Sequence, residues 1–413
     1  MRATKDSGLE WIGVIPAGWS LSKIGQVYRL RNTKVSDTDY PPLSVTNKGI
    51  VPQLDTAAKT NAHDDRKLVK RGDFAINSRS DRRGSCGISD YDGSVSLINT
   101  ILAPLNEMNP GYYDWLFHTV QFGDEFYKFG HGIVDDLWTT GWQEMKKITI
   151  PTPPLHEQQR IADFLDAKCA EIDALTADIQ TQIDTLEQYK RSVITETVTK
   201  GLNSDAEMKD SGIEWVGQMP SSWSIVPNKY LMYKIKSICP VYNGENILSL
   251  TTNGVIIRDL NGGGKMPTSF DGYQKVVPGN LLMCLFDIDV TPRCIGLIKN
   301  FGLTSPAYSQ FVMKDGAYAP YYHYYYLMVD YTKELLHMAK NLRHSLTEDQ
   351  LGAIKVPKPP YDEQIQIAEY LDNKCSKIGR TIADKNNQLA ILEEYKKSLI
   401  FEYVTGKKEV PPS

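Results

Sequence analysis

The sequence PTPPLHEQQRIADFLDAKCAEI, residues 151–172, occurs a second time, with substitutions, as PKPPYDEQIQIAEYLDNKCSKI, residues 357–378. The match resumes between LEQYKRSVITETVT (186–199) and LEEYKKSLIFEYVT (392–405). Both pairs of stretches are offset by 206 residues, so no insertion or deletion separates them. Self-similarity at a long, fixed period indicates that one structural unit is repeated along the chain.

A second pair of matched stretches marks the start of each copy. Residues 5–20 read KDSGLEWIGVIPAGWS, residues 209–224 read KDSGIEWVGQMPSSWS, and ten of the sixteen positions are identical. Between the matched stretches the copies diverge but can still be aligned, for example PLSVTNKGIV (42–51) with ILSLTTNGVI (247–256). The chain therefore alternates twice between a variable segment and a constant one.

The constant segments are predicted to be long helices that form a coiled coil. Apolar residues recur in them every seven positions, and a partial second row lies three or four positions away. The first row is Leu165, Ile172, Ile179, Leu186 and Val193, repeated as Leu371, Ile378, Leu392 and Leu399, and the partial row is Ile161, Leu175 and Tyr189. The preceding prolines and the following Lys200-Gly201 predict a helix from about Glu157 to Lys200. A helix of roughly 60 Å, at ~1.5 Å per residue, needs a packing partner, and its twin is the obvious one.

The variable segments are predicted to be mixed in secondary structure. Short runs of strand-forming residues, such as 43–45, 74–76 and 281–284, alternate with Gly and Asn turns. An aromatic run that follows Pro110-Gly111 predicts a helix over residues 112–128. Each variable segment is about 150 residues long by this division, which is enough for a core of its own.

The expected fold class is therefore α+β, with two similar globular domains separated by two long helices. The helices are expected to pack as an antiparallel coiled coil, which gives the molecule pseudo-twofold symmetry. The expected boundaries are residues 1–150 and 204–356 for the globular domains and 151–203 and 357–408 for the helical spacers.

Composition indicates an ordinary globular protein of more than one domain. The 413 residues are 41% hydrophobic and 23% charged, and the formal net charge is −4. A surface for an anionic partner must therefore be local and offset by acidic residues elsewhere. The six cysteines form no C-x-x-C pair, and we expect reduced, buried thiols. The start of the chain has no apolar signal core, so a cytoplasmic location is expected.

The sequence offers little that is typical of a catalytic site. A methyltransferase that acts on the amino group of a base needs an Asn/Asp-Pro-Pro-aromatic loop, and the nearest strings have the wrong order or the wrong acceptor. They are Asp39-Tyr40-Pro41-Pro42 and Lys358-Pro359-Pro360-Tyr361. Gly262-Gly263-Gly264-Lys265-Met266 lacks the first glycine and the hydroxyl of a phosphate loop. Short E-x-K strings match part of a nuclease site, but the upstream acidic residue that such a site needs is not recognisable. We expect any catalysis to lie on other chains.

The candidate contacts to DNA are basic and amide side chains of the variable segments. Arginine pairs with guanine and asparagine with adenine in the major groove, and both also hold phosphates. The loop from Asn77 to Gly84 is the most basic polar stretch of the first half. The candidates are Lys48, Asn77, Arg79, Arg82 and Arg83 in the first half, and Arg258, Lys265, Arg293, Arg343 and His344 in the second. These residues differ between the two halves, which predicts that each half recognises a different DNA sequence.

The aromatic run Tyr321–Tyr326 has two interpretations. It aligns with residues 112–117, which are also rich in aromatic side chains. A helix face packed on the domain core explains both stretches, and base stacking is the weaker alternative.

The doubled blocks around EWIGVIPAGW and PPLHEQQRIADFLD resemble those of specificity subunits of type I restriction-modification systems. The resemblance covers nearly the whole chain. It implies two target-recognition domains, each reading one half of an asymmetric bipartite DNA site, and paired helices that set the unread gap. It also implies two modification subunits, which methylate adenine with S-adenosylmethionine, and restriction subunits that use ATP and Mg. Those cofactors belong to the partners and none to this chain.

The resemblance also places the main docking surface for the modification subunits on the constant helices. The residues expected to take part are Glu157, Gln158 and Tyr189 in the first copy and Glu363, Gln364 and Tyr395 in the second. Two alternatives stay open from the residues themselves. One is an enzyme with a degenerate nuclease or methyltransferase site, and the other is a coiled-coil adaptor that binds proteins without DNA sequence preference.

Overall fold

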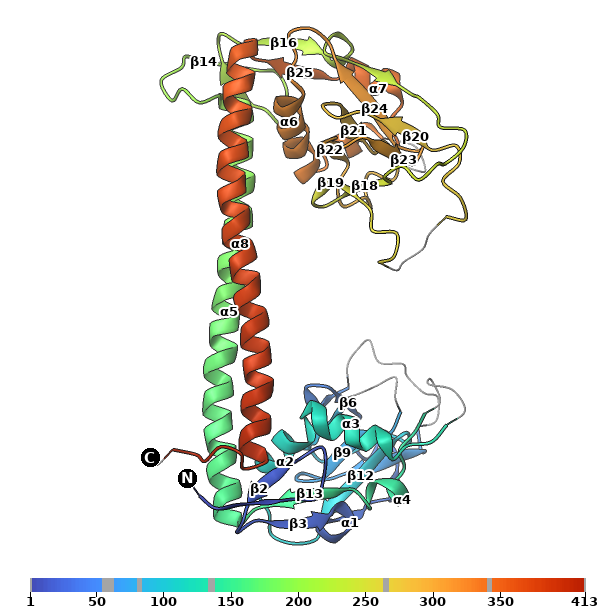
Figure 1. Ribbon diagram of the computed structural model, residues 1–413, viewed down its shortest axis with the longest axis vertical. Coiled ribbons are helices and arrows are strands. Elements are labelled where there is room, and N and C mark those ends of the chain that lie inside the picture. The colour runs from blue at the N-terminus through green and yellow to red at the C-terminus, as the bar shows by residue number, and fades with distance from the viewer. Residues whose placement is uncertain are drawn as a thin grey trace. The chain divides into compact units, whose positions relative to one another are not determined.

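The computed structural model describes residues 2–53, 63–79, 84–132, 138–262, 267–339 and 344–411. The chain divides into two compact units. The first unit comprises Met1–Ile179 and Asn386–Ser413, and the second comprises Gln180–Lys385. Each unit therefore contains one globular part and a stretch of both long helices (Figure 1).

The first unit is built around a four-stranded antiparallel sheet in the order β10-β9-β12-β4. Its strands are Cys86–Ile88, Phe74–Asn77, Asn99–Pro104 and Tyr28–Leu30. Three strand pairs are β1 (Thr4–Asp6) with β2 (Val14–Pro16), β3 (Ser20–Lys23) with β13 (Thr149–Thr152), and β6 (Leu43–Thr46) with β7 (Gly49–Pro52). A three-stranded sheet has the order β11-β8-β5, with β8 (Arg66–Val69) between β11 (Gly93–Ser96) and β5 (Lys34–Val35). The central strand β9 is buried along its whole length, which explains its continuous apolar run.

The helices of the first globular part are short. They are α1 (Ile24–Val27), α2 (Pro110–Phe117), α3 (Val120–Lys128) and α4 (Trp142–Met145). The single helix expected over 112–128 is thus two helices. Thr119 explains the break, because its hydroxyl accepts from Phe122 N at 3.2 Å and caps α3, and donates to Leu116 O at 2.7 Å.

The second unit repeats this plan. Its four-stranded antiparallel sheet has the order β17-β24-β21-β22. The strands are Met232–Ile235, Ser309–Met313, Leu281–Met283 and Ile295–Leu297. The other pairings are β14 (Met208–Asp210) with β15 (Gln218–Pro220), β16 (Ser224–Pro227) with β25 (Lys355–Lys358), β18 (Leu248–Thr251) with β19 (Gly254–Ile257), and β20 (Gln274–Val276) with β23 (Gly302–Thr304). The helices are the 3-10 helices η3 (Asn228–Tyr230) and η4 (Glu334–Met338) and the α-helices α6 (Ala319–Tyr331) and α7 (Glu348–Ala353).

The two units share not only strand order but individual contacts. Trp19 Nε1 donates to Glu157 at 2.8 Å, and Trp223 Nε1 donates to Glu363 at 2.9 Å. Tyr112 donates its hydroxyl to Val404 O at 2.8 Å, and its aligned partner Tyr321 donates to Val198 O at 3.0 Å. Both tryptophans are fully buried and meet these tyrosines edge to face. The expectation of mixed helix and strand content is therefore confirmed, and the two units are built on one plan.

The long helices are α5 (Leu155–Lys200) and α8 (Tyr361–Val404), so the predicted start of α5 is two residues late. In the first unit Phe164 stacks on Tyr403 at 4.5 Å, and Asp173 pairs with Lys396 at 2.5 Å. The residue number falls along one helix as it rises along the other, so the two stretches run in opposite directions there. In the second unit Lys374 lies over the ring of Tyr189, and Lys385 donates to Gln182, in the same sense.

The helix seam differs from the prediction in its second row. The seven-residue row that includes Leu165, Ile172 and Ile179 is buried as expected. The predicted partial row is confirmed at Ile161, which is buried, and is wrong at Leu175 and Tyr189, which are exposed. The buried second row lies one position further along, four residues after the first, and comprises Cys169, Ile183 and Thr197.

Each long helix ends at a glycine that contacts the block at the start of a copy. Gly201 (φ +74) lies against Trp223, and Gly406 (φ +71) lies against Pro16 and Trp19. A left-handed residue satisfies the last carbonyl groups of a helix, and glycine adopts that conformation without steric cost.

The cores also bear out two expectations on aromatic and cysteine residues. Within the run 321–326 His323 is partly buried, and the tyrosines are buried in the core of the second unit. The six cysteines are free and buried. In the described ranges no helix has the length and apolar character needed to cross a membrane.

Candidate nucleic-acid interface

A two-stranded hairpin projects its turn beside the central sheet in each unit. In the first unit it is β6–β7, and in the second it is β18–β19. The turns are built alike: Thr46 donates to Gly49 O at 2.9 Å, and Thr251 donates to Gly254 O at 3.0 Å. Residue 48 is lysine in one turn, and the aligned residue 253 is asparagine in the other. The scaffold is thus constant, while the exposed side chain at the tip changes.

Glycines in the sheet allow these hairpins to lie close to it. A Cβ at Gly87 of β10 would lie 2.8 Å from Gly49, and a Cβ at Gly296 of β22 would lie 2.6 Å from Val255. Close approach of one backbone to another is a usual reason for glycine inside a strand. The hairpin turns are therefore positioned by the sheets beneath them.

The first-unit candidates separate into surface and structural residues. Lys48 is exposed at the hairpin tip. Arg79 is exposed too, and its backbone is fixed by a bridge to Thr139 and by Tyr127, which donates to Arg79 O at 3.1 Å. Asn77 is a correction: its side chain is 6% exposed and accepts from Arg79 N at 3.0 Å, so it shapes the loop from inside. Its amide is not available to a base in this structure.

Four of the predicted DNA contacts lie outside the described residues. They are Arg82, Arg83, Lys265 and Arg343. They stay predictions from the sequence.

The second-unit candidates lie at different places on the globular part. Arg258 follows β19 directly, and its backbone N–H donates to Ile247 O at 2.7 Å. His344 Nε2 lies 3.7 Å from the Asp289 carboxylate, and the residue has a left-handed backbone (φ +42). Arg293 lines a hollow of about 560 Å³ together with the hairpin-tip residues Thr252 and Asn253. The structure therefore brings Arg293 and the hairpin tip together.

The hollow beside Arg293 also contains two cations of helix α5, Lys190 and Arg191. The sequence had assigned this helix to spacing and docking, and neither residue was among the candidates. A difference between the copies could have drawn attention to them. Residues 171–174 read Glu-Ile-Asp-Ala, whereas the aligned residues 377–380 read Lys-Ile-Gly-Arg.

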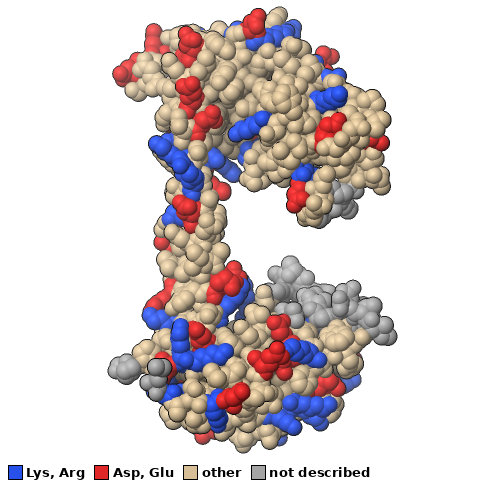
Figure 2. Space-filling view, in the orientation of Figure 1, with Lys and Arg blue, Asp and Glu red and all other residues tan. Residues whose placement is uncertain are grey.

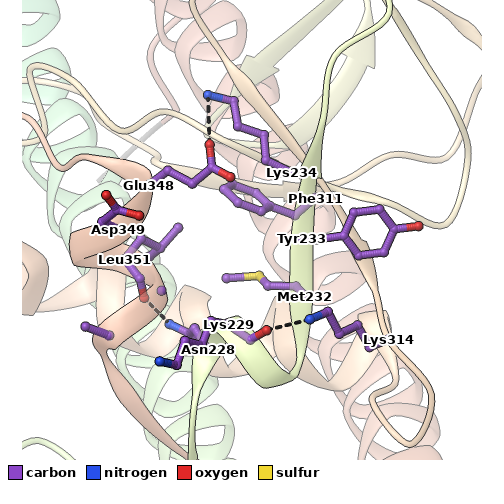
Figure 3. Close-up of a pocket in the computed structure, with 12 residues that line it drawn as sticks. Asn228, Lys229, Met232, Tyr233, Lys234, Phe311, Lys314, Glu348, Asp349 and Leu351 are labelled. Atoms are coloured by element: carbon purple, nitrogen blue, oxygen red, sulfur yellow. Dashed lines mark hydrogen bonds and ion pairs between the residues drawn. The ribbon is translucent and has the colours of Figure 1, made fainter.

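A second hollow in the second unit, of about 390 Å³, lies between η3, β17 and α7 (Figure 3). Its polar side chains hold one another: Lys234 pairs with Glu348 at 3.8 Å, and Lys314 donates to Lys229 O at 2.7 Å. Asn228 donates to Leu351 O at 2.9 Å (Figure 3). These groups stabilise the junction of three elements, and they do not converge on an open position as groups that hold a ligand do.

The predicted docking residues Gln158 and Gln364 are a further correction. Gln158 is 4% exposed and Gln364 is fully buried. Gln364 Oε1 accepts from Tyr318 N at 2.8 Å, and its Nε2 donates to Pro359 O at 2.8 Å. Gln158 makes the matching contacts, accepting from Asn109 N at 2.9 Å and donating to Pro153 O at 2.8 Å. Both amides join a helix start to a loop of their own unit, and they present no surface to another protein.

Glu157 and Glu363 receive the indole N–H groups of Trp19 and Trp223, so they also serve the fold of their units. Glu157 is additionally paired with Arg2 at 2.6 Å. Burial alone would raise the Glu157 pKa. The hydrogen bonds from Arg2 and Trp19 and the charge of Arg2 outweigh it and hold this pKa below its usual value. These carboxylates therefore already bind groups of their own unit.

Tyr189 and Tyr395 differ from the other predicted docking residues because they are open to solvent. They occupy the same position of the two long helices and are 46% and 52% exposed. Large exposed aromatic side chains on a helix are common in protein interfaces. Figure 2 shows Lys and Arg interspersed with Asp and Glu over the globular parts, without one broad basic face in this view. In the described ranges no cluster of His, Cys, Asp and Glu is suited to a metal ion.

Comparison with known proteins agrees with these observations. Residues 16–185 match the family described as "Type I restriction modification DNA specificity domain". The chain is 25% identical to the type I restriction enzyme MjaVIII specificity subunit of Methanocaldococcus jannaschii, over 77% of this chain and 76% of the relative. It is 26% identical to the putative MjaX specificity subunit of the same organism, over 65% of this chain and 61% of that relative.

Solved structures show the same fold. A chain from a structure described as "Structural basis underlying complex assembly and conformational transition of the type I R-M system" matches with a TM-score of 0.73 and 14% identity, covering 95% of this chain and 99% of that one. The HsdS subunit from Thermoanaerobacter tengcongensis matches with a TM-score of 0.51 and 16% identity, covering 95% and 98%. The chain is thus similar, in part of its sequence and over most of its fold, to DNA specificity subunits of type I restriction-modification systems.

Proposed function

We propose that the two units read the two halves of an asymmetric, bipartite DNA site. The observation that carries this proposal is the combination of an identical scaffold with different exposed residues. The Trp–Glu and Tyr–carbonyl contacts recur in both units, whereas the hairpin tip changes from Lys48 to Asn253. Two domains that bind DNA in the same way but carry different side chains recognise different sequences, because base pairs differ in the hydrogen-bond donors and acceptors at their edges.

The long helices are proposed to act as one antiparallel, pseudo-twofold pair that sets the gap between the half-sites. The opposite running of α5 and α8 within each unit supports this arrangement. Two contacts on one stiff body make the second binding event effectively intramolecular, which raises the affinity for a site with the correct gap.

The partners are proposed to be double-stranded DNA, two modification subunits and the restriction subunits. The exposed Tyr189 and Tyr395 support docking of one modification subunit at each equivalent helix position. S-adenosylmethionine, ATP and Mg are then used by those partners.

The experiment that tests the reading is selection of target sites from random duplexes. The full chain is co-purified with its modification subunits and the methylated adenines are mapped. We expect one split motif with two unlike half-words and a fixed gap. No sequence preference would favour the adaptor, and methylation or cleavage by the chain alone would favour the enzyme.

The helical spacer has its own test. Insertion of seven residues, two helical turns, into the segment 180–186 preserves the seam. We expect the gap to change and both half-words to stay the same. An altered half-word with an unchanged gap would contradict the spacer role.

A further inference from the structure

The hollow beside Arg293 joins helix α5 to the globular part of the second unit. Lys190 and Arg191 of α5 line it together with Gly379 of α8, and Arg293 and the hairpin tip line it from the globular part. At about 560 Å³ it is large enough to admit a phosphate group and its neighbouring sugar atoms. The chemistry of the hollow therefore depends on which of these cations are already neutralised.

The two remaining charged groups of the globular wall neutralise each other. Lys333 pairs with Asp330 at 2.8 Å and also donates to Thr291 O at 2.6 Å. By contrast, Lys190, Arg191 and Arg293 form no ion pair within the described ranges. The other carboxylate of the lining is the exposed Glu187, so three free cations face one carboxylate.

Two guanidinium groups converge on one side of the hollow. Arg191 lies over the ring of Tyr331 at 5.0 Å from its centre. Arg293 and Tyr331 line the same hollow. Burial raises the Tyr331 pKa to about 12, and the charges of Arg293 and Arg191 both oppose that rise. Stacking on the ring holds the guanidinium of Arg191 while leaving its N–H groups free to donate.

The equivalent cations of the first unit are already paired. Lys396 and Lys397 occupy the positions of Lys190 and Arg191, 206 residues further along. Lys396 pairs with Asp173 at 2.5 Å. Lys397 pairs with Glu393 and Glu394, both at 2.9 Å.

Two substitutions remove carboxylates from the second unit, while Glu187 stands where the first unit has Glu393. Gly379 stands where the first unit has Asp173, and Gln188 stands where it has Glu394. Burial raises the pKa of Cys169 and of the aligned Cys375, and Lys396 and Lys190 oppose the rise in the two cases. Lys190 therefore occupies the same place as Lys396 but lacks its carboxylate.

We propose that this hollow binds a backbone phosphate of the DNA duplex through Lys190, Arg191 and Arg293. The paired lysines of the first unit do not offer such a contact. The site rests on the proposed reading of DNA and adds a sequence-independent grip on one half-site. Phosphate contacts fix the position of a protein on the duplex, so this grip places the second hairpin tip against its bases.

The sharpest variant restores the missing carboxylate. A Cβ at Gly379 has nothing within 4 Å, so Gly379→Asp fits without a clash. We expect the new carboxylate to pair with Lys190, as Asp173 does with Lys396. Binding to the selected duplex then weakens about 3- to 10-fold near 0.1 M salt, and the slope of log K against log salt becomes shallower by about 1. The matched control is Gly379→Asn, which has the same size and no charge and is expected to leave both quantities unchanged.

A second set of variants removes the cations themselves. Lys190→Gln with Arg191→Gln is expected to weaken binding to specific and random duplexes by similar factors and to reduce the salt slope by about 2. The matched pair in the first unit, Lys396→Gln with Lys397→Gln, is expected to change the slope by less than about 0.5 because those ammonium groups are already paired. All measurements use the full chain with its modification subunits, and circular dichroism checks the fold.

Three outcomes overturn the site. One is an unchanged salt slope in Gly379→Asp, and another is equal weakening by Gly379→Asn. The third is loss of modification-subunit binding with DNA affinity per assembled complex unchanged, which would assign the hollow to a protein interface. If the wild-type complex selects no motif, the proposed function fails instead, and the salt slopes of the variants still report on the phosphate site separately.

Discussion

The two units agree in the contacts that hold their folds and differ in the charges that they expose. Trp19 and Trp223 are both fully buried and both bonded to the first turn of a long helix. At aligned surface positions, however, Lys396 has a carboxylate partner, whereas Lys190 has none among the residues that the structure describes. A residue kept in both copies is therefore most simply explained by folding. A residue that changes while its surroundings stay constant is the better candidate for function.

The largest expected effect tests the shared part of this comparison. Trp19→Ala and Trp223→Ala each remove a fully buried indole and leave Glu157 or Glu363 without its N–H donor. We expect each to lower the free energy of unfolding by about 3–5 kcal/mol. Urea unfolding of the full chain, followed by far-UV circular dichroism, measures both. A large loss of unfolding free energy in one variant and none in the other would show that the two scaffolds are not equivalent.

The next effect concerns pH and distinguishes the units. His323 aligns with Asp114. Burial, together with the charges of Arg293 and Lys299, lowers the His323 pKa to about 4. Its folded-state pKa is thus below the unfolded value of about 6.5, so the unfolded chain binds the proton first. Stability is then complete above pH 6.5 and is lost as the pH falls toward 4, by up to about 3 kcal/mol.

His323→Gln is expected to remove this acid-side loss, as measured by urea unfolding between pH 7 and pH 4. His344→Gln is the matched control, because its imidazole is exposed. In the first unit the sign is opposite: burial raises the Asp114 pKa, so that group destabilises the fold as the pH rises through its folded-state pKa. An unchanged pH profile in His323→Gln would show that the imidazole is not held neutral.

A smaller effect ranks the buried glutamines. Gln364 makes three hydrogen bonds, including one from Nε2 to Gly316 O at 3.1 Å, whereas Gln158 makes two. Replacement of either glutamine by leucine leaves buried backbone groups without a hydrogen-bond partner, which costs about 1–3 kcal/mol of stability at each site. We expect Gln364→Leu to lower the unfolding free energy more than Gln158→Leu. Modification-subunit affinity per folded chain should be the same for both variants and the wild type, and a specific loss would return these residues to the docking surface.

The smallest expected effect comes from creating, in the first unit, an unpaired lysine like that of the proposed phosphate site. Asp173→Gly releases Lys396 in the first unit, in imitation of Gly379. We expect DNA affinity to rise by about 2- to 3-fold at low salt, with a salt slope steeper by less than about 1. Fluorescence anisotropy across a salt series measures the change. Asp173→Asn, which keeps the size and removes the charge, should act in the same direction, and weaker binding in both would oppose the account.

Much of the fold could be predicted because its signal is periodic. The seven-residue row of α5 was found, and its start was misplaced by two residues. The partial row through Leu175 and Tyr189 was wrong because apolar residues three and four positions away are hard to separate from spacing alone. The break at Thr119 was missed because a cap depends on a hydroxyl that also occurs within helices.

The candidate site was less predictable, for a physical reason. Gln158 and Gln364 are repeated in both copies, and repetition alone does not distinguish a buried amide from a docking residue. Asn77 has the right chemistry for adenine, yet its carbonyl is used by Arg79 N. Lys190 became a candidate only when the structure showed which of two aligned lysines lacks a carboxylate.

The central claim is that one scaffold reads two words through its variable surface. The most direct measurement replaces residues 24–148 with residues 228–354, so that both units carry the second variable segment. The chimera is assembled with the modification subunits and its methylated adenines are mapped. The account predicts a symmetric target made of two inverted copies of one wild-type half-word with the gap retained. A target that keeps both original half-words, from a folded and assembled chimera, would contradict it.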